Sequence, residues 1–151
     1  MKEIFPHNPI RAIRVDDADY AWLISLGPWR VNGLGYARNS RNLSMGRAIL
    51  GLVPDNPLTV DHIDHNPLNN QRANLRIATR SQNQANRRRQ KNHFIGVRPH
   101  RHRFKAYLVV DGKQKHLGSF ATAEAAARAR DTEALRAYGE FAALNFQQVP
   151  S

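Results

Sequence analysis

Residues 60–87 read VDHIDHNPLNNQRANLRIATRSQNQANR, and this stretch decides the fold of the first half of the chain. Residues 59–63 predict a short strand, in which neighbouring side chains point to opposite faces. A polar, asparagine-rich loop leads to residues 75–78, where a second short strand is expected. Thr79 and Gln82 have the spacing of a capping box and predict a helix directly after that strand. The expected unit is therefore strand, loop, strand and helix.

Four side chains of this stretch form a set suited to phosphodiester chemistry. Cleaving such a bond needs a cation that neutralises developing charge and a base that activates water. Asp61 offers a hard oxygen ligand for Mg²⁺ or Mn²⁺, and His62, on the opposite face of the strand, can accept a proton from water at neutral pH. Asn83, inside the helix, can return a second oxygen to the cation. Asn74 stands just before the second strand and is placed to orient the histidine region.

The charge of the chain is strongly positive and unevenly distributed. The 151 residues contain 23 Lys and Arg against 12 Asp and Glu, which gives a formal net charge of +11. Eleven of these cations and a single acid, Asp111, fall within residues 80–116. Such a block favours polyanions as partners, because neutralised phosphates release their condensed counterions. A solvated basic linker is the alternative for residues 86–92, but a strand-like apolar pattern resumes at Phe94.

The composition also disfavours several classes of protein. The chain has no cysteine, so neither disulfides nor cysteine-paired zinc knuckles brace the fold. No stretch has the length and apolar character of a membrane span or a signal peptide. We therefore expect a soluble protein of the cytoplasm, in a bacterial cell or a phage-infected host, with no membrane partner.

The N-terminal part predicts small elements around a shared core. The expected elements are a strand over residues 10–15, a helix over 18–26, a hairpin at Asn32-Gly33 and a short helix over 44–50. Trp22 and Trp29 are expected to anchor the core of this part rather than to stack on bases.

The C-terminal part predicts one complete small domain. Three strands are expected, over residues 94–98, 104–110 and 114–120. Asp111-Gly112 has the sequence of a tight hairpin turn. Thr122 caps an alanine-rich helix that Gly139 ends. By alternation, one set of side chains on the middle strand faces this helix and the other faces outward: Ala106, Leu108 and Val110 inward, and Lys105, Tyr107 and Val109 outward.

The first unit resembles the HNH homing endonucleases of phages, in the branch whose motif reads Asp-His, then Asn, then a helical Asn. The resemblance is carried by Val60-Asp61-His62-Ile63, Asn69-Asn70, Asn74-Leu75-Arg76, and Thr79 with Ser81-Gln82-Asn83. It implies a ββα-metal fold with one divalent cation per site. It also implies that Asp61 and Asn83 are metal ligands, that His62 is the general base, and that Asn74 holds the motif together.

One position departs from this family. Its members commonly carry a histidine immediately before the arginine of the short helix that precedes the motif, and here Gly46 stands before Arg47. A histidine that helps to bind DNA or to position the site would therefore be missing. Glycine also makes a short helix more flexible.

The C-terminal unit resembles the AP2 DNA-binding domain, in Gly96-Val97-Arg98, residues 104–107 and 117–120, the alanine-rich helix and Leu144-Asn145-Phe146. The resemblance implies a three-stranded sheet in the major groove of double-stranded DNA. The tryptophan and several arginines of plant members are replaced here, so their target sequences do not carry over. The residues expected to contact DNA are Arg98, Arg101, Arg103, Lys105, Tyr107, Gln114, His116, Arg87, Arg88 and Arg89.

The predicted fold class is α+β: an HNH ββα-metal nuclease domain over residues 1–90, with its core at 59–90, followed by an AP2-like domain over residues 91–148. The predicted function is metal-dependent hydrolysis of phosphodiester bonds in double-stranded DNA, by a monomer or a homodimer. The alternative is a non-catalytic regulator that uses both domains to bind DNA, which the departure at Gly46 favours. An RNA-binding protein fits less well, because no aromatic stacking surface of the usual kind is present.

Overall fold

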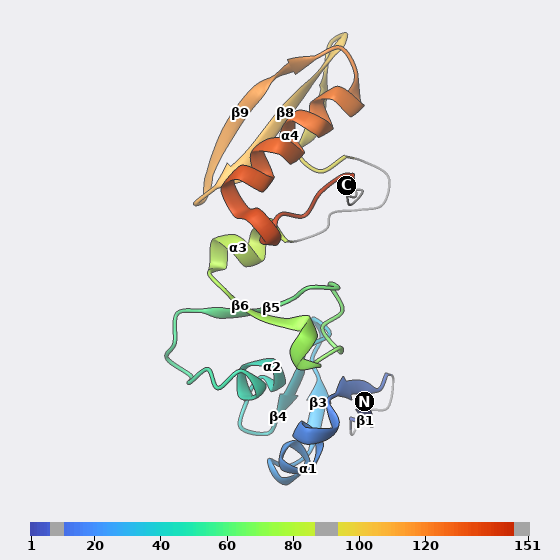
Figure 1. Cartoon of the computed structure of the whole chain (residues 1–151), viewed down its shortest axis with the longest axis vertical. Coiled ribbons are helices and arrows are strands. Elements are labelled where there is room, and N and C mark those ends of the chain that lie inside the picture. Colours follow the sequence, from blue (N-terminus) through green and yellow to red (C-terminus); the bar gives the residue numbers. More distant parts are fainter. Residues whose placement is uncertain (7–10, 87–93, 147–151) are drawn as a thin grey trace. The chain divides into compact units, whose positions relative to one another are not determined.

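The computed structural model describes residues 1–6, 11–86 and 94–146 (Figure 1). The chain divides into two compact units, Met1–Thr79 and Arg80–Ser151, and each is described by itself. Both units combine short helices with small antiparallel sheets. None of the described helices has the length and apolar character needed to cross a membrane.

The first unit consists of short strands in antiparallel pairs, with helices between them. β1 pairs with β2, β3 with β4, and β5 with β6. In chain order the elements are β1 (Lys2–Ile4), β2 (Ile13–Val15), α1 (Asp17–Ser25), β3 (Trp29–Val31), β4 (Ala37–Asn39), α2 (Met45–Ile49), β5 (Thr59–His62), η1 (Arg72–Asn74) and β6 (Leu75–Ala78).

These short elements share one core, because none of them is long enough to bury its apolar face alone. Trp29 is buried at the start of β3, and its indole N–H donates to the carbonyl of Leu23 at 2.8 Å. Trp22 is partly buried against the same core. Both tryptophans therefore anchor the core, as predicted. The buried members are Ile4, Ile13, Val15, Leu23, Trp29, Ala37, Met45, Ile49, Leu68 and Leu75.

The second unit contains a three-stranded antiparallel sheet in the order β7-β8-β9. Asp111 and Gly112 connect β8 to β9, and both have positive φ, 49° and 77°, as a tight hairpin turn requires. The three predicted strands are confirmed, with β7 beginning three residues later than expected. The elements are α3 (Arg80–Ala85), β7 (Val97–His100), β8 (Arg103–Val110), β9 (Lys113–Phe120), α4 (Ala123–Tyr138) and η2 (Gly139–Phe141).

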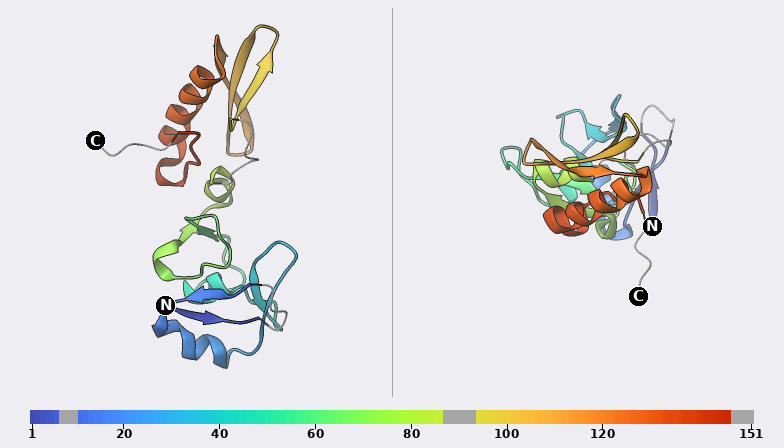
Figure 2. Two further views of the ribbon diagram at one scale, coloured as in Figure 1. Left: turned by 90° about the vertical axis from the view of Figure 1, so that its right-hand side faces the viewer. Right: turned by 90° about the horizontal axis from the view of Figure 1, so that it is seen from above.

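Helix α4 covers one face of this sheet and runs along β8 and β9 (Figures 1 and 2). The Thr122 hydroxyl accepts a hydrogen bond from the Ala125 N–H at 3.1 Å, and Gly139, with φ of 53°, ends the helix. The predicted N-cap at Thr122 and the predicted end of the helix at Gly139 are thus confirmed. Ala106 and Leu108 are buried on the helix side, whereas Val109 is 51% exposed. The alternation predicted for the middle strand is therefore confirmed as well.

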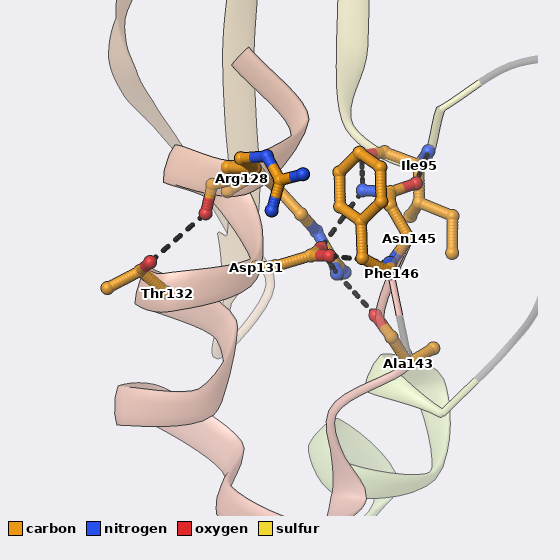
Figure 3. A network of polar contacts seen from close by, with 8 residues as sticks. Ile95, Arg128, Asp131, Thr132, Ala143, Asn145 and Phe146 are labelled. Atoms are coloured by element: carbon orange, nitrogen blue, oxygen red, sulfur yellow. Dashed lines mark hydrogen bonds and ion pairs between the residues drawn. The ribbon is translucent and has the colours of Figure 1, made fainter. Parts of the chain in front are cut away.

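A polar network ties the segment after α4 to the helix and to the start of the sheet (Figure 3). The backbone N–H of Asn145 donates to Asp131 at 2.7 Å, and its side-chain amide donates to Asp131 at 2.9 Å and to the carbonyl of Ile95 at 3.2 Å. Arg130, buried beside Asp131, donates to the carbonyl of Ala143. These bonds attach two segments to α4: the chain just before β7 and the chain after η2.

Helix α3 packs within the second unit. The sequence assigns the helix after Thr79 to the first domain, whereas the contacts group α3 with the second unit. There the carbonyl of Ala85 accepts the N–H of Ala143 at 3.1 Å. The domain boundary at residues 90 and 91 stays a prediction. The predicted end of this helix and the contact residues Arg87, Arg88 and Arg89 lie outside the described residues.

Candidate active site

Asp61 and His62 end β5, and both side chains are buried. The register of the β5–β6 pair places Asp61 opposite Arg76 and His62 opposite Leu75. This register follows from the apolar residues, because Leu75 belongs to the core of the first unit. The hairpin therefore fixes the backbone position of both candidate residues in one compact unit.

Asp61 is held by an ion pair with the residue across the hairpin. Arg76 Nε lies 2.8 Å from Asp61 Oδ2, with the Asp61 side chain 4% and the Arg76 side chain 13% exposed. A carboxylate so far removed from water needs a partner of this kind, because burying an unpaired charge is strongly unfavourable. A divalent cation that binds Asp61 would therefore share this carboxylate with the Arg76 guanidinium.

The donor set around Asp61 suits a hard cation bound mainly by oxygen. Carboxylate and amide oxygens are the ligands that Mg²⁺ and Mn²⁺ favour. In the part of the chain that the structure describes, no group of three or more His, Asp or Glu side chains is arranged to hold a metal ion. The pairing of Asp61 with an asparagine oxygen as ligands of such a cation stays a prediction.

The buried ring of His62 lies near the amide of Asn70 and the ring of Tyr36. Its Nε2 is 3.4 Å from Asn70 Oδ1, and its ring centroid is 6.0 Å from that of Tyr36. Burial lowers the pKa of His62 below its ordinary value, against the opposite effects of the Asn70 contact and of the carboxylates of Asp64 and Asp61. This lowered pKa favours the neutral ring, which is the form that accepts a proton.

Asn70 is itself held in place by burial and by two hydrogen bonds. Its side chain is buried, its Nδ2 donates to the carbonyl of Pro67 at 3.2 Å, and its backbone N–H donates to the carbonyl of Arg14 at 2.8 Å. Because Nδ2 is the donor toward Pro67, Oδ1 is the atom turned toward His62. The amide thus offers an acceptor to the imidazole.

Asn74 and Asp64 close the loop between β5 and β6. The Asn74 side chain accepts the N–H of Asp64 at 3.0 Å and donates to the Asp64 carboxylate at 2.9 Å and to the carbonyl of Asn69 at 2.8 Å. Its backbone carbonyl accepts the N–H of Ile63 at 3.0 Å. Burial alone would raise the pKa of Asp64, but bonds from Asn69, Asn66 and Asn74 hold that pKa below the ordinary value. Asn74 therefore supports the chain directly after His62, consistent with its predicted orienting role.

The loop between β5 and β6 is also bound by acidic residues at the start of α1. Arg72 donates from Nε and Nη2 to the two oxygens of Asp19, both at 2.8 Å. Asp16 stands at the N-cap of α1, yet its carboxylate accepts from the Arg72 N–H at 2.8 Å and from the Gln71 side chain at 3.2 Å. Asp16 and Asp19 thus hold the loop that carries Asn70 and Asn74.

Gly46 is packed against this site rather than open to solvent. A Cβ at this position would lie 3.1 Å from Val60 Cγ1 and 3.4 Å from Asn70 Oδ1. The next residue, Arg47, donates to the backbone carbonyls of Leu58, Asn56, Pro54 and Val53 and so organises the loop before β5. A side chain at position 46 would require Val60 to shift by a few tenths of an ångström and would contact Asn70.

The remaining predicted ligand and the predicted DNA contacts lie in the second unit. Asn83 lies in α3, and its role as a metal ligand stays a prediction. Arg98 of β7 has its guanidinium 5.4 Å from the Tyr107 ring centroid, and the Tyr107 ring is 5.2 Å from that of His116. Lys105 is paired with Arg98, and Gln114 is exposed on β9. Most of these side chains thus share the sheet face opposite α4.

Arg101 and Arg103 lie at the other end of β8. Arg101 is exposed in the turn between β7 and β8, where its φ of 54° shows a left-handed backbone. Arg103 is exposed and donates to the carbonyl of Ser119 at 2.8 Å. These two cations therefore border the sheet face, in agreement with their predicted placement around the first turn.

The region around this site matches a family of nucleases. Residues 45–85 match the HNH endonucleases. The HNH-matching segment contains α2, β5, β6 and α3, and so includes Asp61, His62, Asn74 and Asn83. An uncharacterised HNH endonuclease of Acanthamoeba polyphaga mimivirus is 41% identical to this chain over 98 residues, which cover 64% of the chain. The aligned part spans 51% of that viral protein, about half of its length.

Three positions that support the HNH-matching segment were not assigned a role from the sequence alone. Asn70 contacts His62, Arg76 pairs with Asp61, and Asp19 binds Arg72. The strand register would have revealed Arg76, because aligning Val60 with Ile77 places Asp61 opposite it. No local pattern connects Asp19 with a loop more than fifty residues away.

Proposed function

We propose that the chain is a metal-dependent, homing-type DNA endonuclease that hydrolyses phosphodiester bonds in double-stranded DNA. The observation that supports this most directly is the buried His62 next to the ion-paired carboxylate of Asp61, on a hairpin within the HNH-matching segment. A base and a hard oxygen ligand on consecutive residues are the parts that such a hydrolysis needs.

In this proposal His62 takes the proton of the attacking water. Asn70 Oδ1 faces His62 Nε2, and the proposed tautomer is the one that carries its proton on Nε2 and accepts at Nδ1. Asn74 and Asp64 keep the chain after His62 in one conformation. The imidazole is therefore held in one orientation before the substrate arrives, which is how a positioned base contributes most to the rate.

Asp61 and Asn83 would hold the divalent cation, Mg²⁺ or Mn²⁺, one per site. When bound, the cation neutralises the charge that develops on the phosphate and on the leaving oxygen. Arg76, across the hairpin, holds the Asp61 carboxylate in place through their ion pair. The second unit docks the enzyme on DNA through its AP2-like sheet, with Arg98, Arg101, Arg103 and Lys105 near phosphates.

The test is incubation of the purified chain with supercoiled plasmid, with and without Mg²⁺ or Mn²⁺. Nicked or linear plasmid that appears only with a divalent cation, and that is lost in His62→Ala, supports the enzyme. Plasmid that stays intact with every divalent cation, although the chain binds it, favours the non-catalytic regulator instead.

A further inference from the structure

The sheet face opposite α4 carries an apolar and an amide side chain directly across from each other. Val109 of β8 pairs with Gln114 of β9, and the next outward pair along the two strands is Tyr107 with His116. Val109 is 51% exposed, while its neighbour Leu108 is buried beneath α4. Cβ atoms of directly opposed residues lie about 4.5–5.5 Å apart. The two side chains therefore present one small mixed surface.

The surroundings of this pair suit nucleic acid rather than a protein core. Lys105 and Arg98 are paired on the same face, and the guanidinium of Arg98 stacks on Tyr107. Two twisted strands of this kind fit the major groove of duplex DNA. Single exposed valines are common on protein surfaces. The exposure of Val109 therefore indicates a binding surface only together with its amide partner and the cations beside it.

The chemistry of the pair matches one base pair in particular. In the major groove adenine shows an acceptor at N7 and a donor at N6, which a glutamine amide binds in a bidentate manner, and thymine shows a methyl group that apolar side chains contact. We infer that Val109 and Gln114 together read an A·T base pair, with Gln114 on adenine and Val109 on the methyl group of its thymine. This inference rests on the proposed docking of the sheet on double-stranded DNA.

The first experiment selects preferred sites from a pool of randomised duplexes, with the full chain in EDTA so that no cleavage occurs. We expect one strongly selected A·T position whose preference disappears in Gln114→Ala and weakens in Val109→Ala. The matched control is Lys115→Ala, because Lys115 lies on the other side of β9 and pairs with Glu133 of α4. It should retain the preference.

The second experiment changes the DNA instead of the protein, so it does not depend on the folding of a variant. Replacing the selected adenine by 7-deazaadenine should weaken binding of the unaltered chain about tenfold, as expected for a lost bidentate contact. Replacing its thymine by uracil removes the methyl group and should weaken binding about fourfold. Gln114→Ala should be insensitive to the first change, and Val109→Ala to the second.

The outcomes separate this inference from the proposed function. A chain that binds no duplex overturns the docking proposal, and the inference with it. A chain that binds and selects sites, but whose preferences are unchanged in Gln114→Ala and Val109→Ala, overturns the inference alone. Binding without any base preference at all would do the same.

Discussion

His62 Nε2 and Asn70 Oδ1 lie 3.4 Å apart, and both side chains are buried. Asn70 is anchored in turn to Pro67 and to Arg14, so the position of the imidazole depends on a loop and on strand β2 as well as on β5. The orientation of the candidate base is therefore a property of the whole first unit.

Asn70→Ala should slow cleavage without weakening DNA binding, because the imidazole loses the acceptor that holds it. We expect a loss of at least about tenfold, below the roughly 10²–10⁴-fold loss expected for His62→Ala. Stability should fall by about 1–3 kcal/mol, since buried groups lose their partners. Single-turnover nicking and urea denaturation measure the two effects. Asn66→Ala in the same loop, where the side chain is exposed, is the control; equal losses in both variants would contradict the assignment.

Asp61→Ala should destabilise the fold as well as remove a metal ligand. It leaves the Arg76 charge in a site that is largely shielded from water, which costs about 3–5 kcal/mol when a buried pair is broken. The double variant Asp61→Ala with Arg76→Met should recover much of this stability and none of the cleavage. Urea denaturation and titration of nicking against Mg²⁺ concentration distinguish the two losses. If Asp61→Ala is as stable as the parent, the ion pair contributes nothing to folding.

The Asp19–Arg72 pair predicts a pH dependence of stability. The hydrogen bonds from Arg72 lower the pKa of Asp19, so the carboxylate adds stability that is fully present above its ordinary pKa near 3.9 and is lost as the pH falls through the lowered folded-state pKa. Asp19→Asn should therefore be less stable than the parent at pH 7, and the difference should shrink below about pH 4. Thermal unfolding across pH measures this. The exposed Asp55→Asn is the control, and an equal difference at pH 7 and pH 3 would refute the prediction.

Gly46→His should impair the site, although a histidine is common at this position in the HNH family. The Cβ of the new side chain would lie 3.1 Å from Val60 Cγ1 and 3.4 Å from Asn70 Oδ1, and the rest of the imidazole adds bulk beside both residues. Overpacking of this kind costs about 1–3 kcal/mol, and movement of Asn70 should also slow cleavage. Gly33→Ala is the matched control, since a Cβ there meets nothing within 4 Å. A Gly46→His variant that is more stable and more active would show that the packing adapts.

DNA binding by the full chain should depend steeply on salt, and two residues of the sheet face should account for part of this slope. Each phosphate contact contributes about 0.9 to the slope of log K against log salt, so Arg98→Ala and Lys105→Ala should each reduce the slope by about one. Arg136→Ala removes an exposed cation of α4 that pairs with Glu133 and should leave the slope unchanged. Equal effects of all three variants would argue against docking through the sheet.

Local pattern alone was sufficient for elements whose signals are contained within a few residues. The Asp111-Gly112 turn, the Thr122 cap, the Gly139 stop and the alternation along β8 follow from the backbone preferences of single residues and from the period of a strand. The HNH-like spacing from Asp61 to Asn83 was also readable, and the match over residues 45–85 includes it, whereas the roles of these residues stay predictions.

Tertiary structure decided which groups surround the candidate base. The hydrogen bonds of Asp16 and Asp19 with the loop join residues more than fifty positions apart. The limited space at Gly46 arises because α2 lies against β5. Such contacts depend on how separate elements pack into one core, and no periodicity within either segment encodes them. Local sequence was thus enough to predict most elements and to nominate the candidate site residues, whereas the contacts of Asn70 with His62 and of Arg76 with Asp61 depend on the packing of the first unit.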